Sequence, residues 1–233
     1  MSPTLICGDR KETVRDAGDP RHDAAQRAAP GQPTRAAIVT AAGELVSLEG
    51  LDRLSMRRLA AAVGISKSAL YQHFASKEEL LLAVIGHSRD VFEAEVVRDP
   101  PRDNAQHGLG LLLERWLAFF EEKVFPGGCF FISSAVDFAS RPGRVRNALE
   151  KALDREVEVL EAAILRAREA GELIAEKHAG QTAFELHAIL LHAHALHQVK
   201  RDPAMLAHAR AALRKVLGES EERESRAAGP PLA

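Results

Sequence analysis

The residues best suited to a chemical task lie in one basic stretch, residues 53–77, which reads RLSMRRLAAAVGISKSALYQHFASK. This stretch holds five Lys or Arg side chains and no Asp or Glu, although the whole chain has a formal net charge of −2. Cationic side chains that no acid offsets are the groups that contact the phosphates of nucleic acids. Because the chain as a whole is not cationic, any contact with a nucleic acid must come from a local patch such as this one.

The same stretch predicts two short helices joined by a tight turn. Ser55 and Ser66 each stand where an N-cap is needed, because a serine hydroxyl accepts a hydrogen bond from a free N–H of the first turn. Gly64 lies between the helices and can end the first one in a left-handed conformation. Leu70 and Phe74 form an i, i+4 pair that would be buried. This pattern is typical of a helix-turn-helix, although the spacing alone also fits an ordinary helical hairpin with a solvated basic face.

The residues after this stretch strengthen the first interpretation. Ser76 and Glu79 form a capping box that opens another helix, SKEELLLAV. The continuous string LSMRRLAAAVGISKSALYQHFASKEELLLAV closely resembles the N-terminal DNA-binding domain of the tetracycline-repressor (TetR) family of bacterial transcriptional regulators. The resemblance covers about residues 34–85 and fades beyond them.

This resemblance implies that the second helix of the motif enters the major groove of double-stranded DNA, with two subunits on a palindromic operator. The residues expected to contact phosphates are Arg35, Arg57, Tyr71, His73 and Lys77. The residues expected to contact bases or the groove floor are Lys67, Ser68, Ala69 and Gln72, and Ser66 completes the predicted DNA-binding set.

Composition predicts the fold class, and the resemblance implies the division into domains. Of the 233 residues, 46% are hydrophobic and 27% are charged, and few apolar runs alternate with a period of two. We therefore expect an all-α protein of about nine helices. Four regions are predicted: a disordered arm (1–33), a three-helix helix-turn-helix domain (34–80), a larger α-helical ligand-binding and dimerisation domain (81–218) and a flexible tail (219–233).

The location in the cell is predicted from cysteine content and hydropathy. The two cysteines are too few for a disulfide scaffold, which favours a reducing cytoplasm. The longest charge-free apolar stretch, residues 186–199, is shorter than the ~20 residues that a membrane-spanning helix needs. We expect a cytoplasmic protein with no membrane role.

A pocket for a small apolar effector is predicted in the second domain, because seven of the nine Phe residues and the single Trp lie between positions 92 and 138. The candidate lining residues are Trp116, Phe120, Cys129, Phe130, Ser133 and Phe138. The alternative is that these side chains are ordinary core. Cys129 follows two glycines at a helix start, where the pKa of a thiol tends to fall, so a redox-sensing thiol is a further alternative to a buried one.

The uncharged stretch from Leu186 to Val199 predicts a helix that is buried on both faces, one of them against a second copy of the chain. The predicted homodimer contacts are Leu186, Leu190, His194, His197 and Leu213. The histidines here could also suggest zinc, but no HExxH motif or paired cysteine accompanies them, so core or interface histidines are favoured and no metal or cofactor is expected.

Together these features predict a homodimeric DNA-binding regulator that is released from its operator by a small molecule. One alternative is a helical DNA-binding or interaction module that has no ligand. Another is an all-α enzyme that uses Cys129 or the histidine cluster. Because no nucleophile, base and orienting group can be assembled from the spacing, we expect no catalytic residue.

Overall fold

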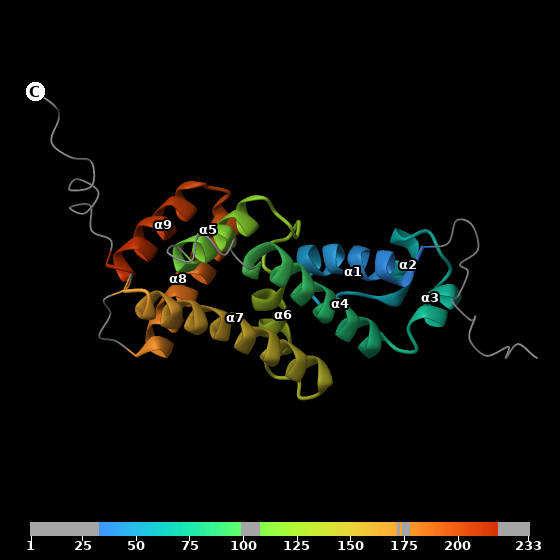
Figure 1. Cartoon of the computed structure of the whole chain (residues 1–233). Coiled ribbons are helices and arrows are strands. Elements are labelled where there is room, and N and C mark those ends of the chain that lie inside the picture. The colour runs from blue at the N-terminus through green and yellow to red at the C-terminus, as the bar shows by residue number, and fades with distance from the viewer. Residues whose placement is uncertain (1–32, 99–107, 172, 174–177, 219–233) are drawn as a thin grey trace, which may run out of the picture. The chain divides into compact units, whose positions relative to one another are not determined.

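The computed structural model describes residues 33–98, 108–171, 173 and 178–218, and the predicted N-terminal arm and C-terminal tail lie almost entirely outside these ranges. All regular secondary structure in the described residues is helical, which confirms the predicted all-α class (Figure 1). The elements are α1 (Arg35–Glu49), α2 (Met56–Ala62), α3 (Lys67–His73), α4 (Lys77–Phe92), a π-helical segment η1 (Glu93–Val97), α5 (Gly108–Glu121), α6 (Phe130–Phe138), α7 (Arg144–Glu169), α8 (Ala179–Lys200) and α9 (Ala204–Val216).

The first four helices each begin after a Ser or Thr cap, and the caps at Ser55, Ser66 and Ser76 are those that the sequence predicts. The hydroxyl oxygens of Thr34, Ser55 and Ser66 accept hydrogen bonds from backbone N–H groups three residues further on, at 3.0–3.2 Å. Ser76 caps α4 in the same way, accepting from the N–H of Glu79 at 3.1 Å. The Glu79 carboxylate completes the capping box, but it accepts from the N–H of Ala75, one residue before the cap, at 2.9 Å.

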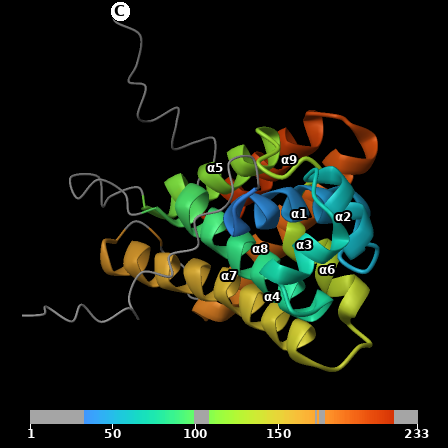
Figure 2. The ribbon, with the colours of Figure 1, turned by 90° about the vertical axis from the view of Figure 1, so that its right-hand side faces the viewer.

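Contacts between helices define two packed groups. Helix α1 packs against α2 and α4, and α2 packs against α3. Helix α7 packs against α4, α5, α6 and α8, and α8 also packs against α9 (Figures 1 and 2). Helix α4 therefore belongs to both groups and connects the helix-turn-helix to the rest of the fold.

The end of α4 departs from a regular α-helix. The α-helical part ends at Phe92, and the next five residues form the π-helical segment η1. Phe92 is buried against the ring of Trp116, with the ring centroids 4.8 Å apart, and Val96 is fully buried. A π turn inside a longer helix often marks a functional position, because it shifts the residues that follow it.

Two contacts join the helix-turn-helix group to the loops around α6. The backbone N–H of Gly127 donates to the hydroxyl of Ser47 at 3.0 Å, and a Cβ added at Gly127 would overlap the Ser47 carbonyl. In the loop between α1 and α2, the carboxylate of Asp52 accepts two hydrogen bonds from the guanidinium of Arg141, and the bond from Nη2 is 3.1 Å long. Both contacts need close approach between segments that lie about 80–90 residues apart.

None of the described helices is long and apolar enough to cross a membrane.

Candidate functional site

The turn between α2 and α3 fixes the position of α3. Gly64 adopts φ +73°, and its N–H donates to the carbonyl of Ala61 at 3.3 Å. The N–H of Ile65 donates to the carbonyl of Ala60 at 2.9 Å. These two bonds form a Schellman motif, which satisfies carbonyls at the end of α2 and requires a residue that tolerates positive φ. Gly64 is that residue, which confirms the predicted turn.

Helix α3 has one buried face and one exposed face. Leu70 within the helix and Phe74 just after it are fully buried, as predicted. The opposite face carries the side chains predicted to read DNA, and most of them are exposed: Ser66, Lys67, Ser68, Tyr71 and Gln72 are exposed, whereas Ala69 and His73 are half-buried. Tyr71 keeps 43% of its surface exposed, and the Lys67 ammonium lies 5.7 Å from the centre of its ring. A short cationic helix with small polar residues fits a major groove.

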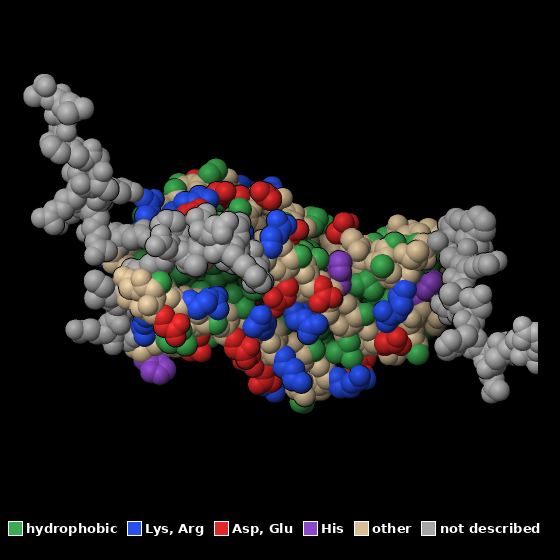
Figure 3. Space-filling view, in the orientation of Figure 1, with side chains coloured by type: hydrophobic (Ala, Val, Ile, Leu, Met, Phe, Trp, Pro, Cys, Tyr) green, Lys and Arg blue, Asp and Glu red, His purple; other side chains and the backbone are tan. Residues whose placement is uncertain are grey.

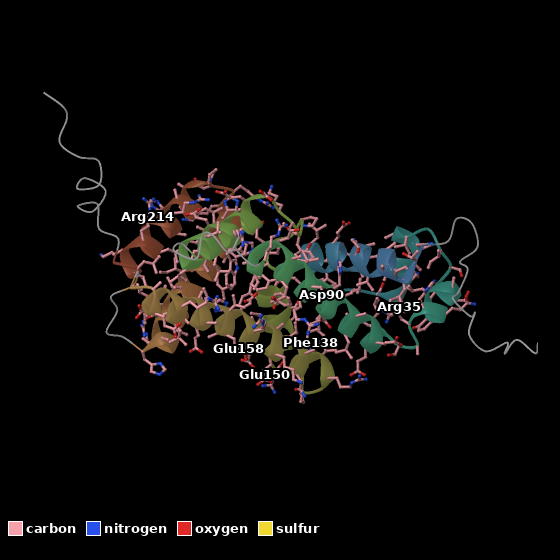
Figure 4. The ribbon with its side chains drawn as sticks, in the orientation of Figure 1. Arg35, Asp90, Phe138, Glu150, Glu158 and Arg214 are labelled. Carbon is pink, nitrogen blue, oxygen red and sulfur yellow. The ribbon has the colours of Figure 1, made fainter. Side chains whose placement is uncertain are left out.

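The predicted phosphate-contacting residues flank this face, but several also serve the fold. The Arg35 guanidinium lies 4.5 Å from the centre of the Phe74 ring and pairs with Glu79 at 3.3 Å (Figure 4). Lys77 Nζ donates to the backbone carbonyl of Asp52 at 3.0 Å. Arg57 is exposed and makes no ion pair in the described part of the chain. Arg57 is therefore the most available of these cations, whereas Arg35 and Lys77 also connect helices.

Two segments of the chain match the models of a known protein family. Residues 38–84 match the family described as "Bacterial regulatory proteins, tetR family", and residues 106–213 match "Tetracyclin repressor-like, C-terminal domain". The chain belongs to the TetR family. Its α2–turn–α3 unit is the family's DNA-binding helix-turn-helix, and the second match extends the family relationship into the region where the sequence resemblance faded.

Individual relatives agree with this family assignment. The chain is 44% identical over 54 residues to the HTH-type transcriptional regulator UidR of Escherichia coli. These 54 residues are 23% of this chain and only 28% of UidR. It is 31% identical over 131 residues to the nucleoid occlusion factor SlmA of Vibrio vulnificus, covering 55% of the chain and 64% of SlmA. A TetR transcriptional regulator from Chloroflexus aurantiacus shares the fold, with a TM-score of 0.73 and 23% identity over 82% of this chain and 97% of that one.

The aromatic residues predicted to line an effector pocket lie in the core. Trp116, Phe120 and Phe130 are almost fully buried and contact other aromatic or histidine rings. Ser133 is exposed, and its hydroxyl donates to backbone carbonyls of its own helix. Phe138 is half-buried at the end of α6, where the Arg141 guanidinium lies 5.3 Å from the centre of its ring (Figure 4).

A hollow with mostly apolar walls lies elsewhere in the described residues. A cavity of about 390 Å³ is bounded by η1, α5 and the C-terminal half of α7, and none of the six predicted lining residues contributes to it. The sequence signal for this cavity was weak. Its walls are Val, Leu and Ala side chains at ordinary helical spacing, and its polar groups are arginines that resemble solvated ones.

Cys129 is buried, and burial raises the pKa of its thiol to about 12. The expectation of a lowered pKa at this helix start is therefore wrong, because removal from water disfavours the thiolate more strongly than the helix terminus favours it. The backbone N–H of Cys129 donates to His194 Nε2 at 2.7 Å. Residue 129 thus serves to anchor the start of α6 to α8.

The histidines take structural positions. His187 Nε2 lies 2.9 Å from a carboxylate oxygen of Glu156 on α7, and Glu156 is buried. Burial raises the pKa of that carboxyl group, and the hydrogen bond from His187 opposes the rise. Glu156 was missed in the sequence, although it falls within the apolar stripe of α7 between Ala152 and Leu160. No cluster of three metal-binding side chains occurs in the ranges that the structure describes.

Four of the five predicted dimer contacts lie inside a single chain. Leu186, Leu190, His194 and Leu213 are each less than 4% exposed, so these side chains have no surface left for a partner. Burial within one chain corrects the prediction for these four residues, three of which lie on α8 and one, Leu213, on α9. The fifth, His197, is half-buried, and its Nδ1 lies 3.1 Å from the carbonyl oxygen of Asp202.

The exposed face of α8 is the one that offers apolar surface. Phe184 is 65% exposed and Val199 is 84% exposed. Ala188 and Ala195 lie between them on the same exposed face, which spans most of the helix. Two large apolar side chains are thus exposed at opposite ends of one face of α8.

Proposed function

We propose that this chain is a ligand-responsive transcriptional repressor that binds a palindromic operator in double-stranded DNA as a homodimer and is released by a small-molecule effector. Residues 34–80 would read DNA, and residues 81–218 would bind the effector and the second subunit. The observation that carries the proposal is the exposed face of α3, held at a fixed angle by the Gly64 turn and free of acidic side chains.

Base contacts would come from the exposed residues at the start and middle of α3. Lys67 and Gln72 have donors and acceptors that match base edges in the major groove. Arg57 and Lys77 would contact phosphates on either side, which sets affinity and register rather than sequence preference. Two copies of α3 would read half-sites separated by ~34 Å, one helical turn of DNA, or by a multiple of it.

The homodimer would form through the exposed apolar face of α8, with α9 beside it. Two copies of this face would bring Phe184 and Val199 out of water, while the small side chains of Ala188 and Ala195 allow the helices to approach closely. A two-fold axis makes such an interface self-complementary, because each subunit offers the same patch. The same axis would set the spacing of the two recognition helices.

Helix α4 would carry the signal between effector and DNA. Its first residues belong to the DNA-reading group, and the η1 segment that directly follows it lines the cavity. An effector that favours one position of α4 would change the affinity of the protein for DNA. Bound DNA would then change the affinity for the effector by the same factor.

Selection of bound duplexes from random-sequence DNA tests the proposal. We expect one palindromic consensus and a footprint confined to it. The Gln72→Ala variant should select a changed consensus, because a base contact is lost. The Lys77→Ala variant should weaken binding to all sequences alike and lower the salt slope by about one. A salt slope that Lys77→Ala leaves unchanged would remove Lys77 from the interface, and failure to select any consensus would refute the reading face of α3.

A second candidate follows from the likeness to SlmA, a nucleoid occlusion factor. On this alternative the chain binds DNA at many dispersed sites without an effector. Mapping of its binding sites across a bacterial genome separates the two. A small number of sites next to promoters would support the repressor. Many sites spread along the chromosome would support the alternative.

A further inference from the structure

The cavity beside η1 combines an apolar interior with a cationic rim. Val96 of η1, Leu112 of α5, and Val159 and Ala163 of α7 form its apolar walls. Its volume of about 390 Å³ lies within the range of sites that hold small organic molecules. An apolar guest would gain free energy in proportion to the surface that it removes from water.

Three arginines, Arg98, Arg115 and Arg166, line the same cavity, and a single acidic residue, Glu169, accompanies them. In the part of the chain that the structure describes, none of the three arginines forms an ion pair. This is unlike the surface over α4 and α7, where Lys and Arg alternate with Asp and Glu and pairs such as Arg155–Glu93, at 2.7 Å, are common (Figure 3). The rim of the cavity therefore has an excess of positive charge.

Arg115 is the best placed of the three. It is half-buried, and its Nη1 donates to the backbone carbonyl of Arg98 at 2.5 Å. This bond restrains the guanidinium at the cavity wall, and its other N–H groups have no partner among the described residues, so they can bind a guest. Arginine suits anionic oxygen groups, because its planar fork donates two parallel hydrogen bonds.

We infer that the cavity binds an amphipathic anion, with an aliphatic chain between α5 and α7 and an anionic oxygen headgroup held by Arg115 and Arg166. This inference rests on the proposed function, since it names the chemical class of the effector. It replaces the purely apolar effector that the aromatic residues suggested. A carboxylate and a phosphate monoester share the required headgroup chemistry.

The position of the cavity relates binding to regulation. Val96 and Val97 lie in η1, directly after α4, so an aliphatic chain in the cavity would touch the end of the helix whose start adjoins the DNA-reading face. A π-helical segment can rearrange to an ordinary α-helical turn by shifting its register by one residue. Occupancy of the cavity would thus bias the position of α4.

The test uses the full-length chain and four ten-carbon probes: decanoate, decyl phosphate, decanol and decylamine. Calorimetry measures binding of each probe to the wild type and to the Arg115→Gln, Arg166→Gln and Arg146→Gln variants. Arg146→Gln is the matched control, because Arg146 is exposed on α7 outside this cavity. Release from the selected operator is measured in parallel.

We expect an anionic probe to bind at least tenfold more tightly than decanol and decylamine. Arg115→Gln and Arg166→Gln should each weaken that binding about tenfold or more, whereas Arg146→Gln should leave it unchanged. Preference for decanoate over decyl phosphate, or the reverse, identifies the headgroup.

Equal binding of decanol and decanoate would overturn the anionic headgroup. If Arg146→Gln weakened binding as much as the other two variants do, the assignment of the probe to this cavity would be wrong. No binding of any probe, by a protein that still selects a palindromic operator, would overturn this inference while leaving the DNA-binding function intact. No operator selection at all would refute the proposed function instead.

Discussion

His194 should make the fold sensitive to mild acid. Its Nε2 accepts a hydrogen bond from the backbone N–H of Cys129 at 2.7 Å, so this nitrogen must be unprotonated. Its Nδ1 is buried without a partner among the described residues. Burial lowers the pKa of the imidazole from 6.5 to about 4, with repulsion from His197 as a smaller cause. Protonation would orphan the N–H of Cys129 at the start of α6.

The sign and size of the effect follow from linkage. Because the pKa of His194 is lower in the folded chain, the unfolded chain binds a proton first as the pH falls below about 6.5. The stability that neutral His194 contributes is present above that pH and is lost as the pH falls towards 4. Between pH 7 and pH 5 the loss is about 2 kcal/mol for an unfolded pKa of 6.5.

Urea denaturation at pH 7 and pH 5, at one fixed protein concentration, measures this loss. The His194→Gln variant keeps a side-chain hydrogen-bond acceptor but cannot titrate, so it should lose about 2 kcal/mol less than the wild type between the two pH values. His208→Gln, which changes an exposed histidine on α9, is the control and should behave as the wild type. Equal losses in His194→Gln and the wild type would refute the assignment of a neutral, buried His194.

Three further outcomes test other parts of the structure. Gly64→Ala should lower the free energy of unfolding by about 1 kcal/mol, because Gly64 has a φ of +73° that alanine tolerates poorly. Gly86→Ala should raise the free energy of unfolding by about 1 kcal/mol, because Gly86 lies within α4 and no atom is near its added Cβ. Thermal unfolding separates the two by opposite shifts of about 2–4 °C, and shifts of the same sign would contradict this explanation of the turn. Phe184→Glu should convert the proposed homodimer to a monomer in light scattering, whereas Val136→Glu, also at an exposed apolar residue, should not. A dimer that survives Phe184→Glu would exclude this face of α8 as its interface. The hydrogen bond with Arg141 lowers the pKa of the Asp52 carboxyl, so the stability that this pair contributes is present above about pH 3.8 and is lost as the pH falls further. Asp52→Asn should therefore lose less stability than the wild type below that pH, as measured by circular dichroism. An equal loss in the two proteins would argue against the pair.

The helix-turn-helix could be predicted from the sequence because its signals are local. Ser55, Ser66 and Ser76 cap helices that begin directly after them, and Gly64 needs only its own backbone to form the turn. Each signal depends on a few neighbouring residues. Their agreement in one short stretch left little freedom for another fold.

The second half could not be predicted to the same depth, because its features depend on which helices meet. From Leu186 to Val199, α8 carries no formal charge on any face, so periodicity could not tell that Leu186 and Leu190 face the core and Phe184 faces solvent. The pairing of Glu156 with His187 depends on the packing of α7 against α8. The aromatic cluster likewise fills the core and does not line the cavity beside η1. The position of a cavity depends on how helices pack in three dimensions, which the sequence pattern does not show.

The bond between Ser47 and Gly127 limits how this regulator could be re-engineered. Exchange of DNA-reading segments between related repressors is an obvious route to new combinations of operator and effector. Here a graft that ends at α3 would replace Ser47 and Asp52 but retain Gly127 and Arg141, so the donor must present a hydroxyl and a carboxylate at the same two positions. Chimeras of this chain should therefore be selected by the residues of the loop after α1 as much as by the bases that α3 recognises.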